Sequence, residues 1–152
     1  MNTKRIAVIA VVLVAFAGGW LYAGRTPLVD GTKVVMYQNP ACGCCSKWAA
    51  HMEATGFTVE IHKTNQLNSI KQREGITPET AGCHTSMVDG YLVEGHVPAR
   101  EIARLITDRP DVKGIAVPGM PMGSPGMEGG RTDHYDVLSI DHEGNTAVFA
   151  SY

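Results

Sequence analysis

Three of the four cysteines in the chain stand within four consecutive positions. The stretch reads NPACGCCSKW, and its thiols belong to Cys42, Cys44 and Cys45. Thiols this close in sequence form disulfides, carry out redox chemistry or bind a soft metal ion. Cys42 and Cys45 have the CxxC spacing of dithiol redox motifs, whereas Cys44 is a third thiol that such a motif does not need. The spacing leaves all three chemistries open, and the extra thiol gives a specific reason to consider a metal.

The fourth cysteine, Cys83, lies far along the chain and is followed directly by His84. If Cys83 faces the same pocket, four sulfurs converge from two loops, and His84 becomes a further candidate ligand. Four thiolates alone suit zinc, whereas thiolates together with thioethers favour Cu(I). Thiolates that each bridge two ions would make good use of such crowding. We therefore expect copper rather than zinc, and more than one ion per chain.

Thioether donors occur in a stretch rich in glycine and proline, GIAVPGMPMGSPGMEGG, residues 114–130. Its methionines are Met120, Met122 and Met127. This composition is not expected to form a regular helix or strand, so these side chains do not make a regular core face. Taken singly, each is more simply a hydrophobic plug in a loop. As a group near a cysteine cluster, they favour a copper site.

The elements that must position these residues follow from apolar periodicity. The expected order is strand 33–38, helix 45–55, strand 57–62, helix 66–74, strands 84–88 and 91–94, a helix between Pro98 and Pro110, and a hairpin of strands 135–141 and 146–151. This is an α/β chain, and its first seven elements have the order of a thioredoxin-like domain. In that layout the CxxC motif lies between the first strand and the first helix, where the helix N-terminus favours thiolate. On the second strand, Phe57, Val59 and Ile61 are expected to face inward.

The charge balance gives no sign of a nucleic-acid partner. The chain has 13 basic and 15 acidic residues among 152, with no like-charge block. A nucleic-acid-binding surface normally shows as a basic stripe in the sequence. We therefore expect no nucleic acid among its partners.

The N-terminus has the pattern of an exported protein. Lys4 and Arg5 precede an uncharged run at residues 6–23, which contains a small-residue cleavage pattern ending at Ala17. The run is also just long enough to remain as a membrane anchor. Both alternatives stay open, and both place the following domain in the periplasm, because the basic residues stay cytoplasmic.

We therefore expect the chain to have two parts. Residues 1–24 are a signal peptide or an inner-membrane anchor, and residues 33–152 are a copper-binding domain that meets the membrane only through that segment. Outside the cytoplasm dithiols tend to oxidise, so two inert structural disulfides are a competing interpretation. A thiol–disulfide oxidoreductase that uses the Cys42/Cys45 pair is another.

The stretches NPACGCCSKW, AGCHTSMVDGYLVEGHVP and VPGMPMGSPGME, in this order, resemble the signatures of the CopG-type family of bacterial periplasmic copper-resistance proteins. That family was long described only as a domain of unknown function or as metal-binding. The resemblance implies a thioredoxin-like fold and a role in copper tolerance beside other envelope copper-handling proteins. It also implies a copper site on the four cysteines with the loop methionines as neighbours. Whether the protein is a copper-dependent oxidoreductase that cycles Cu(I) and Cu(II) is left open.

Overall fold

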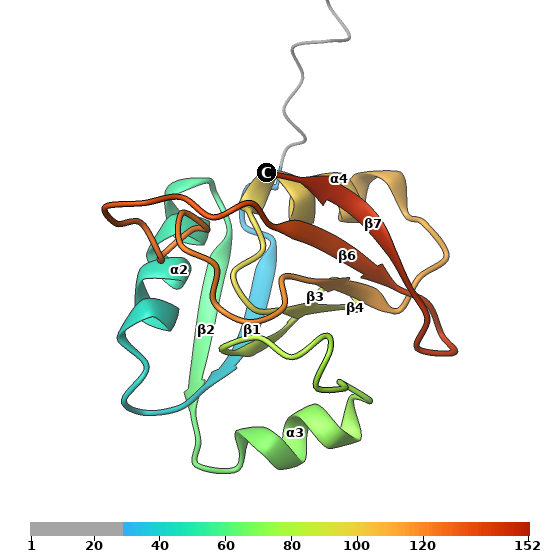
Figure 1. The fold of residues 1–152 in the computed structure, drawn as a ribbon, viewed down its shortest axis with the longest axis horizontal. Helices are drawn as coiled ribbons and strands as arrows, with labels where there is room; N and C mark the ends of the chain where they lie inside the picture. The colour runs from blue at the N-terminus through green and yellow to red at the C-terminus, as the bar shows by residue number, and fades with distance from the viewer. Residues whose placement is uncertain (1–28) are drawn as a thin grey trace, which may run out of the picture.

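The computed structural model of the chain describes residues 29–152 (Figure 1). The predicted signal peptide or anchor, residues 1–24, lies outside the described residues. Within residues 29–152, no helix combines the length and the apolar character needed to cross a bilayer. Val29, the first described residue, is already buried in the hydrophobic core.

Helices and strands follow one another in the predicted α/β order as far as α4, after which one additional strand, β5, appears before the closing hairpin. The elements are β1 (Lys33–Gln38), α2 (Gly43–Ala54), β2 (Thr58–Lys63), α3 (Leu67–Arg73), β3 (Thr85–Val88), β4 (Tyr91–Glu94), α4 (Ala99–Asp108), β5 (Gly114–Ala116), β6 (Asp136–Ile140) and β7 (Thr146–Ser151). Expected and observed boundaries differ by about two residues at most, which is ordinary for element ends. The predicted α/β class and the closing hairpin are confirmed.

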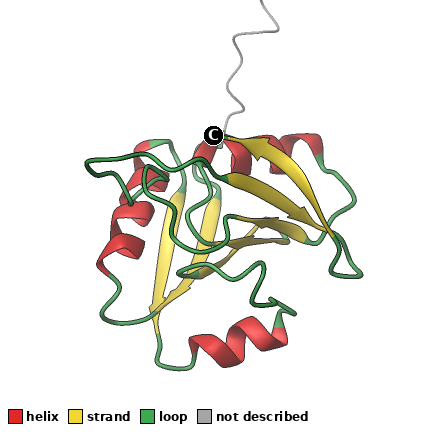
Figure 2. Ribbon diagram, in the orientation of Figure 1, coloured by secondary structure: helices red, strands yellow, loops and turns green. Residues whose placement is uncertain are grey.

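The strands of the described residues form one mixed sheet in the order β2-β1-β3-β4-β5-β6-β7 (Figure 2). β1 is parallel to β2 and β4 is parallel to β5, whereas the other neighbours are antiparallel. The end of β1 meets the start of β3, because Tyr37 pairs with Thr85. The loop after β1 and the segment before β3 therefore lie at the same end of the sheet. These two segments, together with the first turn of α2, carry all four cysteines.

Helices α2 and α4 pack on the sheet in a common core. The buried positions of α2 include Trp48, Ala49 and Met52, which recur at helical spacing. The Trp48 indole N–H donates to the carbonyl of Val97, just before α4, at 2.8 Å. This bond joins the two helical segments inside the core. Fully burying a large apolar side chain contributes about 1.5–3 kcal/mol, so the packing fixes α2 firmly at the sheet end that bears the cysteines.

One prediction for the glycine-rich stretch is wrong, because residues 114–116 form strand β5 inside the sheet. β5 pairs with β4 on one side and β6 on the other. At Gly114, a side chain would place its Cβ only 2.7 Å from the Leu92 carbonyl carbon. The glycine thus permits the close approach of β5 to β4. The composition alone had indicated a loop at these residues.

The inward prediction for Ile61 is also wrong. Phe57 is buried and Val59 half-buried, but Ile61 is 41% exposed. β2 is an edge strand of the sheet, and its alternating apolar residues are covered only at its first part. Alternation predicts which residues share a face and does not predict how far the cover over that face extends.

Candidate metal centre

The loop between β1 and α2 is shaped by Asn39 so that the first cysteine caps the helix. The Asn39 side chain accepts the backbone N–H of Ala41 at 2.9 Å, and its carbonyl accepts the N–H of Cys42 at 3.0 Å. This is a turn of the kind that asparagine favours. Cys42 is the N-cap residue, and Cys44 and Cys45 lie in the first turn of α2. The helix thus begins two residues earlier than predicted and brings all three thiols to its N-terminus.

The four cysteine sulfurs form one compact group. Cys83 is their common neighbour, with its Sγ 3.1 Å from that of Cys42, 3.4 Å from Cys44 and 3.2 Å from Cys45. The Sγ atoms of Cys42 and Cys44 are 3.5 Å apart. All four ligand atoms lie within 4.8 Å of one another. Both segments at the sheet end therefore deliver their sulfurs to a single place, as the sequence predicts.

The group is partly oxidised in this structure. Cys42 and Cys45 form a disulfide across the first turn of α2, with their Cα atoms 5.5 Å apart. Cys44 and Cys83 are free thiols and are half-buried. Burial raises the pKa of the Cys83 thiol to about 12, and the neighbouring Cys44 thiol adds to the rise while Lys71 opposes it. Without a metal, this thiol stays protonated at neutral pH.

His84 lies in the core beside the sulfurs and is not a member of their group. Its ring is fully buried, with centroids 4.4 Å from Trp48 and 5.1 Å from His96. Within residues 29–152, neither of its ring nitrogens has a hydrogen-bond partner. Burial holds the pKa of His84 well below its usual range, and the neighbouring His96 ring and Lys71 ammonium act in the same direction. His84 is therefore neutral and retains a free nitrogen lone pair; its role as a ligand stays a prediction.

The methionine loop, which we define as residues 117–130 after β5, lies against both cysteine-bearing segments. Gly119 forms a parallel bridge with Gly82, and its N–H donates to Ala81 at 2.8 Å. The next residues along these two segments are Met120 and Cys83. Farther on, a Cβ at Gly126 would lie 2.8 Å from the Cys44 carbonyl oxygen, so this loop runs directly on the first turn of α2.

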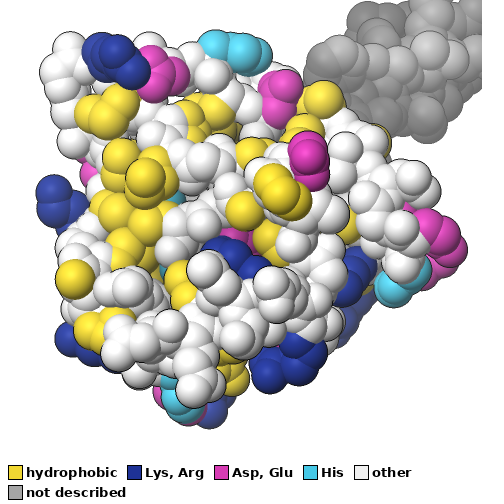
Figure 3. All heavy atoms as spheres, turned by 60° about the horizontal axis from the view of Figure 1, so that its bottom comes forward, with side chains coloured by type: hydrophobic (Ala, Val, Ile, Leu, Met, Phe, Trp, Pro, Cys, Tyr) yellow, Lys and Arg dark blue, Asp and Glu magenta, His cyan; other side chains and the backbone are white. Residues whose placement is uncertain are grey.

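The three candidate methionines differ in exposure. Met120 is 55% exposed, whereas Met122 and Met127 are half-buried. A Cβ at Gly129 would lie 2.6 Å from the methyl carbon of Met122, so that side chain lies along the loop itself. The structure places the loop at the site, and whether any of these sulfurs binds metal stays a prediction. Figure 3 shows hydrophobic side chains gathered at the left of the molecule, where Figure 1 places α2 and this loop.

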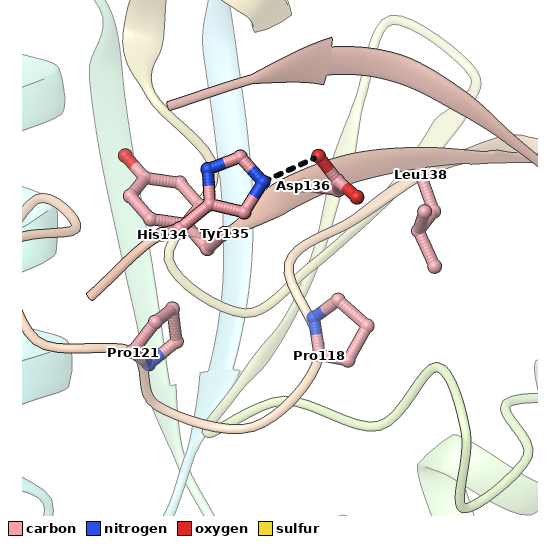
Figure 4. A pocket seen from close by; sticks show the side chains of 6 residues that line it. All are labelled: Pro118, Pro121, His134, Tyr135, Asp136 and Leu138. Carbon is pink, nitrogen blue, oxygen red and sulfur yellow. Dashed lines mark ion pairs between the residues drawn. The ribbon is translucent and has the colours of Figure 1, made fainter.

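A pocket of about 310 Å³ lies on the other side of this loop (Figure 4). It is lined by Pro118, Pro121, His134, Tyr135, Asp136 and Leu138. His134 and Asp136 lie side by side in its lining, with the His134 Nε2 3.7 Å from an Asp136 oxygen. None of the four cysteines lines this pocket, so it is separate from the sulfur group.

Sequence reasoning missed a buried polar group beneath Cys83, made by Lys71, Thr85 and Glu94. Lys71 pairs with Glu94, whose side chain is 0% exposed, and Thr85 donates to the same carboxylate at 2.7 Å. A lysine on a helix and a glutamate at a strand end look like surface residues in the sequence. No local pattern indicates that they meet inside the protein.

Comparisons with known proteins give two kinds of match. Residues 80–127 match a family described as a protein of unknown function, DUF411. A solved structure named copper resistance protein CopG, form 2, is 43% identical with a TM-score of 0.77, and the match covers 81% of this chain and 99% of that chain. Form 1 of the same protein is also 43% identical, with a TM-score of 0.76 and coverage of 81% and 98%. No curated protein sequence matches the chain.

Proposed function

Because the chain belongs to the CopG family of copper resistance proteins, we propose that it binds copper, as Cu(I), in copper resistance or homeostasis. The observation that carries the proposal is the group of four sulfurs within 4.8 Å of one another. Thiolates are the ligands that Cu(I) prefers, and a soft ion can use several of them at once. The name of the related structures supports copper as the metal, and the sulfur geometry supports the four cysteines as the site.

The proposed ligands are those that the sequence suggested. Cys42, Cys44, Cys45 and Cys83 supply the thiolates, and because their sulfurs are so close, each can bridge two ions. This supports more than one copper ion per chain. The additional donors proposed are His84 and the loop methionines Met120, Met122 and Met127. The neutral state of His84 and the bridge between Gly119 and Gly82 support these assignments.

The disulfide links metal binding to redox state. Reducing the Cys42–Cys45 bond takes two electrons and two protons and yields two thiols, so all four sulfurs become ligands only after reduction. In the opposite direction, oxidising this dithiol releases two electrons and two protons. That matches the reduction of two Cu(II) ions to Cu(I). Cycling between the two copper states is therefore part of the proposal, with the dithiol as reductant.

The finer assignments of fold and location rest on sequence and topology together. Strands β2, β1, β3 and β4, with β1 parallel to β2 and antiparallel to β3, support a thioredoxin-like core. The apolar run at residues 6–23 supports export to the periplasm, with cleavage or anchoring. Other copper-handling proteins of the envelope are the proposed partners.

The test is anaerobic reconstitution of the reduced chain with Cu(I) in the presence of a competing chelator. We expect more than one copper ion per chain, bound tightly and lost when the cysteines are alkylated first. Zinc offered under the same conditions should be displaced by copper. Stoichiometry below one, or binding that survives alkylation, would contradict the proposal.

A thiol–disulfide oxidoreductase is the second candidate, favoured by the Cys42–Cys45 disulfide at a helix N-terminus. Reduction of insulin by the dithiol, at a rate comparable to that of a thioredoxin, would support it. Cys44→Ser separates the two functions, because it leaves this disulfide intact and removes one proposed copper ligand.

A further inference from the structure

A single buried carboxylate holds both sides of the segment that carries Cys83. Glu94 ends strand β4, and its Oε1 accepts the backbone N–H of Gly82 at 2.7 Å. Its Oε2 accepts the hydroxyl of Thr85, also at 2.7 Å. Gly82 and Thr85 stand on either side of Cys83 and His84 in the chain. The carboxylate therefore spans this short segment and fixes both of its ends to β4.

The charge of this carboxylate is balanced from the neighbouring helix. The Lys71 ammonium, on α3, forms an ion pair with Glu94 and donates to the Thr85 hydroxyl at 3.1 Å. The Lys71 side chain is only 11% exposed and that of Glu94 is fully buried. A buried ion pair adds little net stability compared with well-packed apolar residues. Stability alone thus gives no reason for this polar group to lie beneath a cysteine.

The backbone packs closely around this segment. The N–H of Gly95 donates to the carbonyl of His84 at 2.9 Å. A Cβ at Gly82 would lie 2.5 Å from the Cα of Gly95, so the backbone on either side of these strands approaches as closely as glycine permits. Residues 29–152 contain no cis peptide bond, so a cis-proline does not shape this segment. The hydrogen bonds to Glu94 supply the restraint.

We infer that Glu94, held by Lys71 and Thr85, is a positioning residue that keeps the Cys83 sulfur against the other three sulfurs. Cys83 is the one cysteine of the group that does not belong to the start of α2, and its sulfur lies within 3.4 Å of each of the other three, so its placement decides whether the two segments share one site. A displacement of about 1 Å at a reacting group can change its effective concentration by about a hundredfold. The inference rests on the proposed function only in that it gives the compact sulfur group a role in binding copper. The positioning itself is measurable without metal.

The test measures the effective concentration of Cys83 relative to Cys42. In the full chain carrying Cys44→Ser and Cys45→Ser, these two thiols remain, and their sulfurs are 3.1 Å apart. Oxidised glutathione converts them to a disulfide and becomes two reduced glutathione molecules, so electrons and protons balance. Equilibration with known glutathione ratios, acid quenching and mass spectrometry give the equilibrium constant. That constant is the effective concentration of one thiol for the other.

Glu94→Gln is added to this background and compared with Glu101→Gln as a matched control. Glu101 is equally buried and is also ion-paired, with Arg100 and Arg104, but on the far helix α4. The glutamine at 94 keeps one acceptor oxygen and loses the second, so one end of the segment is released. We expect the effective concentration to fall about tenfold or more for Glu94→Gln. For Glu101→Gln we expect no change.

A second pair of variants keeps the test decisive if Glu94→Gln does not fold. Thr85→Val removes the hydroxyl that donates to Glu94. Ser86→Ala removes the neighbouring buried hydroxyl, which has no hydrogen-bond partner among the described residues. We expect a reduced effective concentration for Thr85→Val alone. Equal values for Thr85→Val and Ser86→Ala, with native circular dichroism, would overturn the inference. Because no copper is present, this result is independent of whether the chain binds copper.

Discussion

Cys44 takes no part in the disulfide, yet its sulfur lies 3.5 Å from that of Cys42 and 3.4 Å from that of Cys83. A dithiol redox site would function without it, whereas a site for several soft ions needs its thiolate. For Cys44→Ser we expect the Cys42–Cys45 disulfide to form normally and the copper bound per chain to fall by about half or more. Mass spectrometry after alkylation and metal analysis measure the two quantities.

Ser46→Ala is the control for this substitution. Ser46 lies on the same helical turn, and its hydroxyl accepts one long hydrogen bond, 3.4 Å, from Gln38. We expect unchanged copper content for this variant. Full copper binding by Cys44→Ser would show that the third thiol is not a ligand.

At the scale of single residues, the sequence predicts the convergence of the cysteine sulfurs better than it predicts the side chains around them. The spacing of Cys42, Cys44 and Cys45 and the thioredoxin-like order were enough to place Cys83 with them. Lys71 and Glu94 gave no signal, because only tertiary packing buries them and joins them below Cys83. Residue types with strong chemistry are visible in a sequence, whereas ordinary charged residues become informative only once their burial is known.

At the scale of loops and helices, the methionine loop depends on Gly126 for its contact with α2. Gly126 has φ +85°, and a Cβ there would lie 2.8 Å from both the Cys44 carbonyl oxygen and the Trp48 backbone nitrogen. For Gly126→Ala we expect a loss of about 1–3 kcal/mol in the free energy of unfolding, because both strain and a clash arise. We also expect weaker copper binding, since the loop must move away from the cysteines. Urea unfolding and chelator competition measure the two effects.

Gly130→Ala is the matched control for this loop. Gly130 lies in the same segment with nothing within 4 Å of its Cβ position. We expect nearly unchanged stability and copper affinity there. If Gly126→Ala behaves like Gly130→Ala, the loop does not need its close contact with the helix.

Helices α2 and α4 are coupled through His51, which makes the domain sensitive to acid. Its Nε2 accepts the N–H of Ala99 at the start of α4, 3.3 Å away. Burial lowers the pKa of His51 below its usual value of 6.5, while the facing carboxylate of Glu128 opposes this shift. The folded state therefore holds this proton less well than the unfolded chain. The contribution is complete above pH 6.5 and is lost as the pH falls through the lower folded pKa.

Unfolding free energies at pH 7.5 and 5.0 test this dependence. We expect wild type to lose more stability on acidification than His51→Gln, whose amide oxygen accepts the same N–H without titrating. Equal pH dependence in wild type and His51→Gln would remove His51 as the cause.

Element order was predictable because apolar periodicity is local, but strand β5 was not. Gly114, Ile115 and Ala116 are too few to show alternation, and they stand in a stretch that otherwise reads as loop. Their strand conformation comes from pairing with β4 and β6 on both sides. In the same way, the exposure of Ile61 depends on what covers an edge strand, which neighbouring residues in the sequence do not reveal.

For the whole molecule, copper binding should appear as added stability of the fold. A ligand that binds only the folded state stabilises it by about 2.7 kcal/mol at a free concentration of 100 times Kd. For a domain of this size we therefore expect a rise in Tm of about 5–15 °C for the reduced chain with Cu(I). Anaerobic thermal unfolding at several copper concentrations measures the shift.

Cys83→Ser is the comparison for this experiment, because it removes the sulfur that lies within 3.4 Å of each of the other three. We expect little or no rise in Tm for this variant. An equal rise for both proteins would mean that copper binds elsewhere.

The cysteines reach one place only through the pairing of β1 with β3, where Tyr37 lies opposite Thr85. No continuous peptide of this chain carries all of the proposed ligands close together. An unfinished chain leaving the ribosome, or one cut by a protease, would therefore hold copper far more weakly than the finished protein. If the proposed copper site is occupied in the cell, degradation of this protein would therefore release the bound copper.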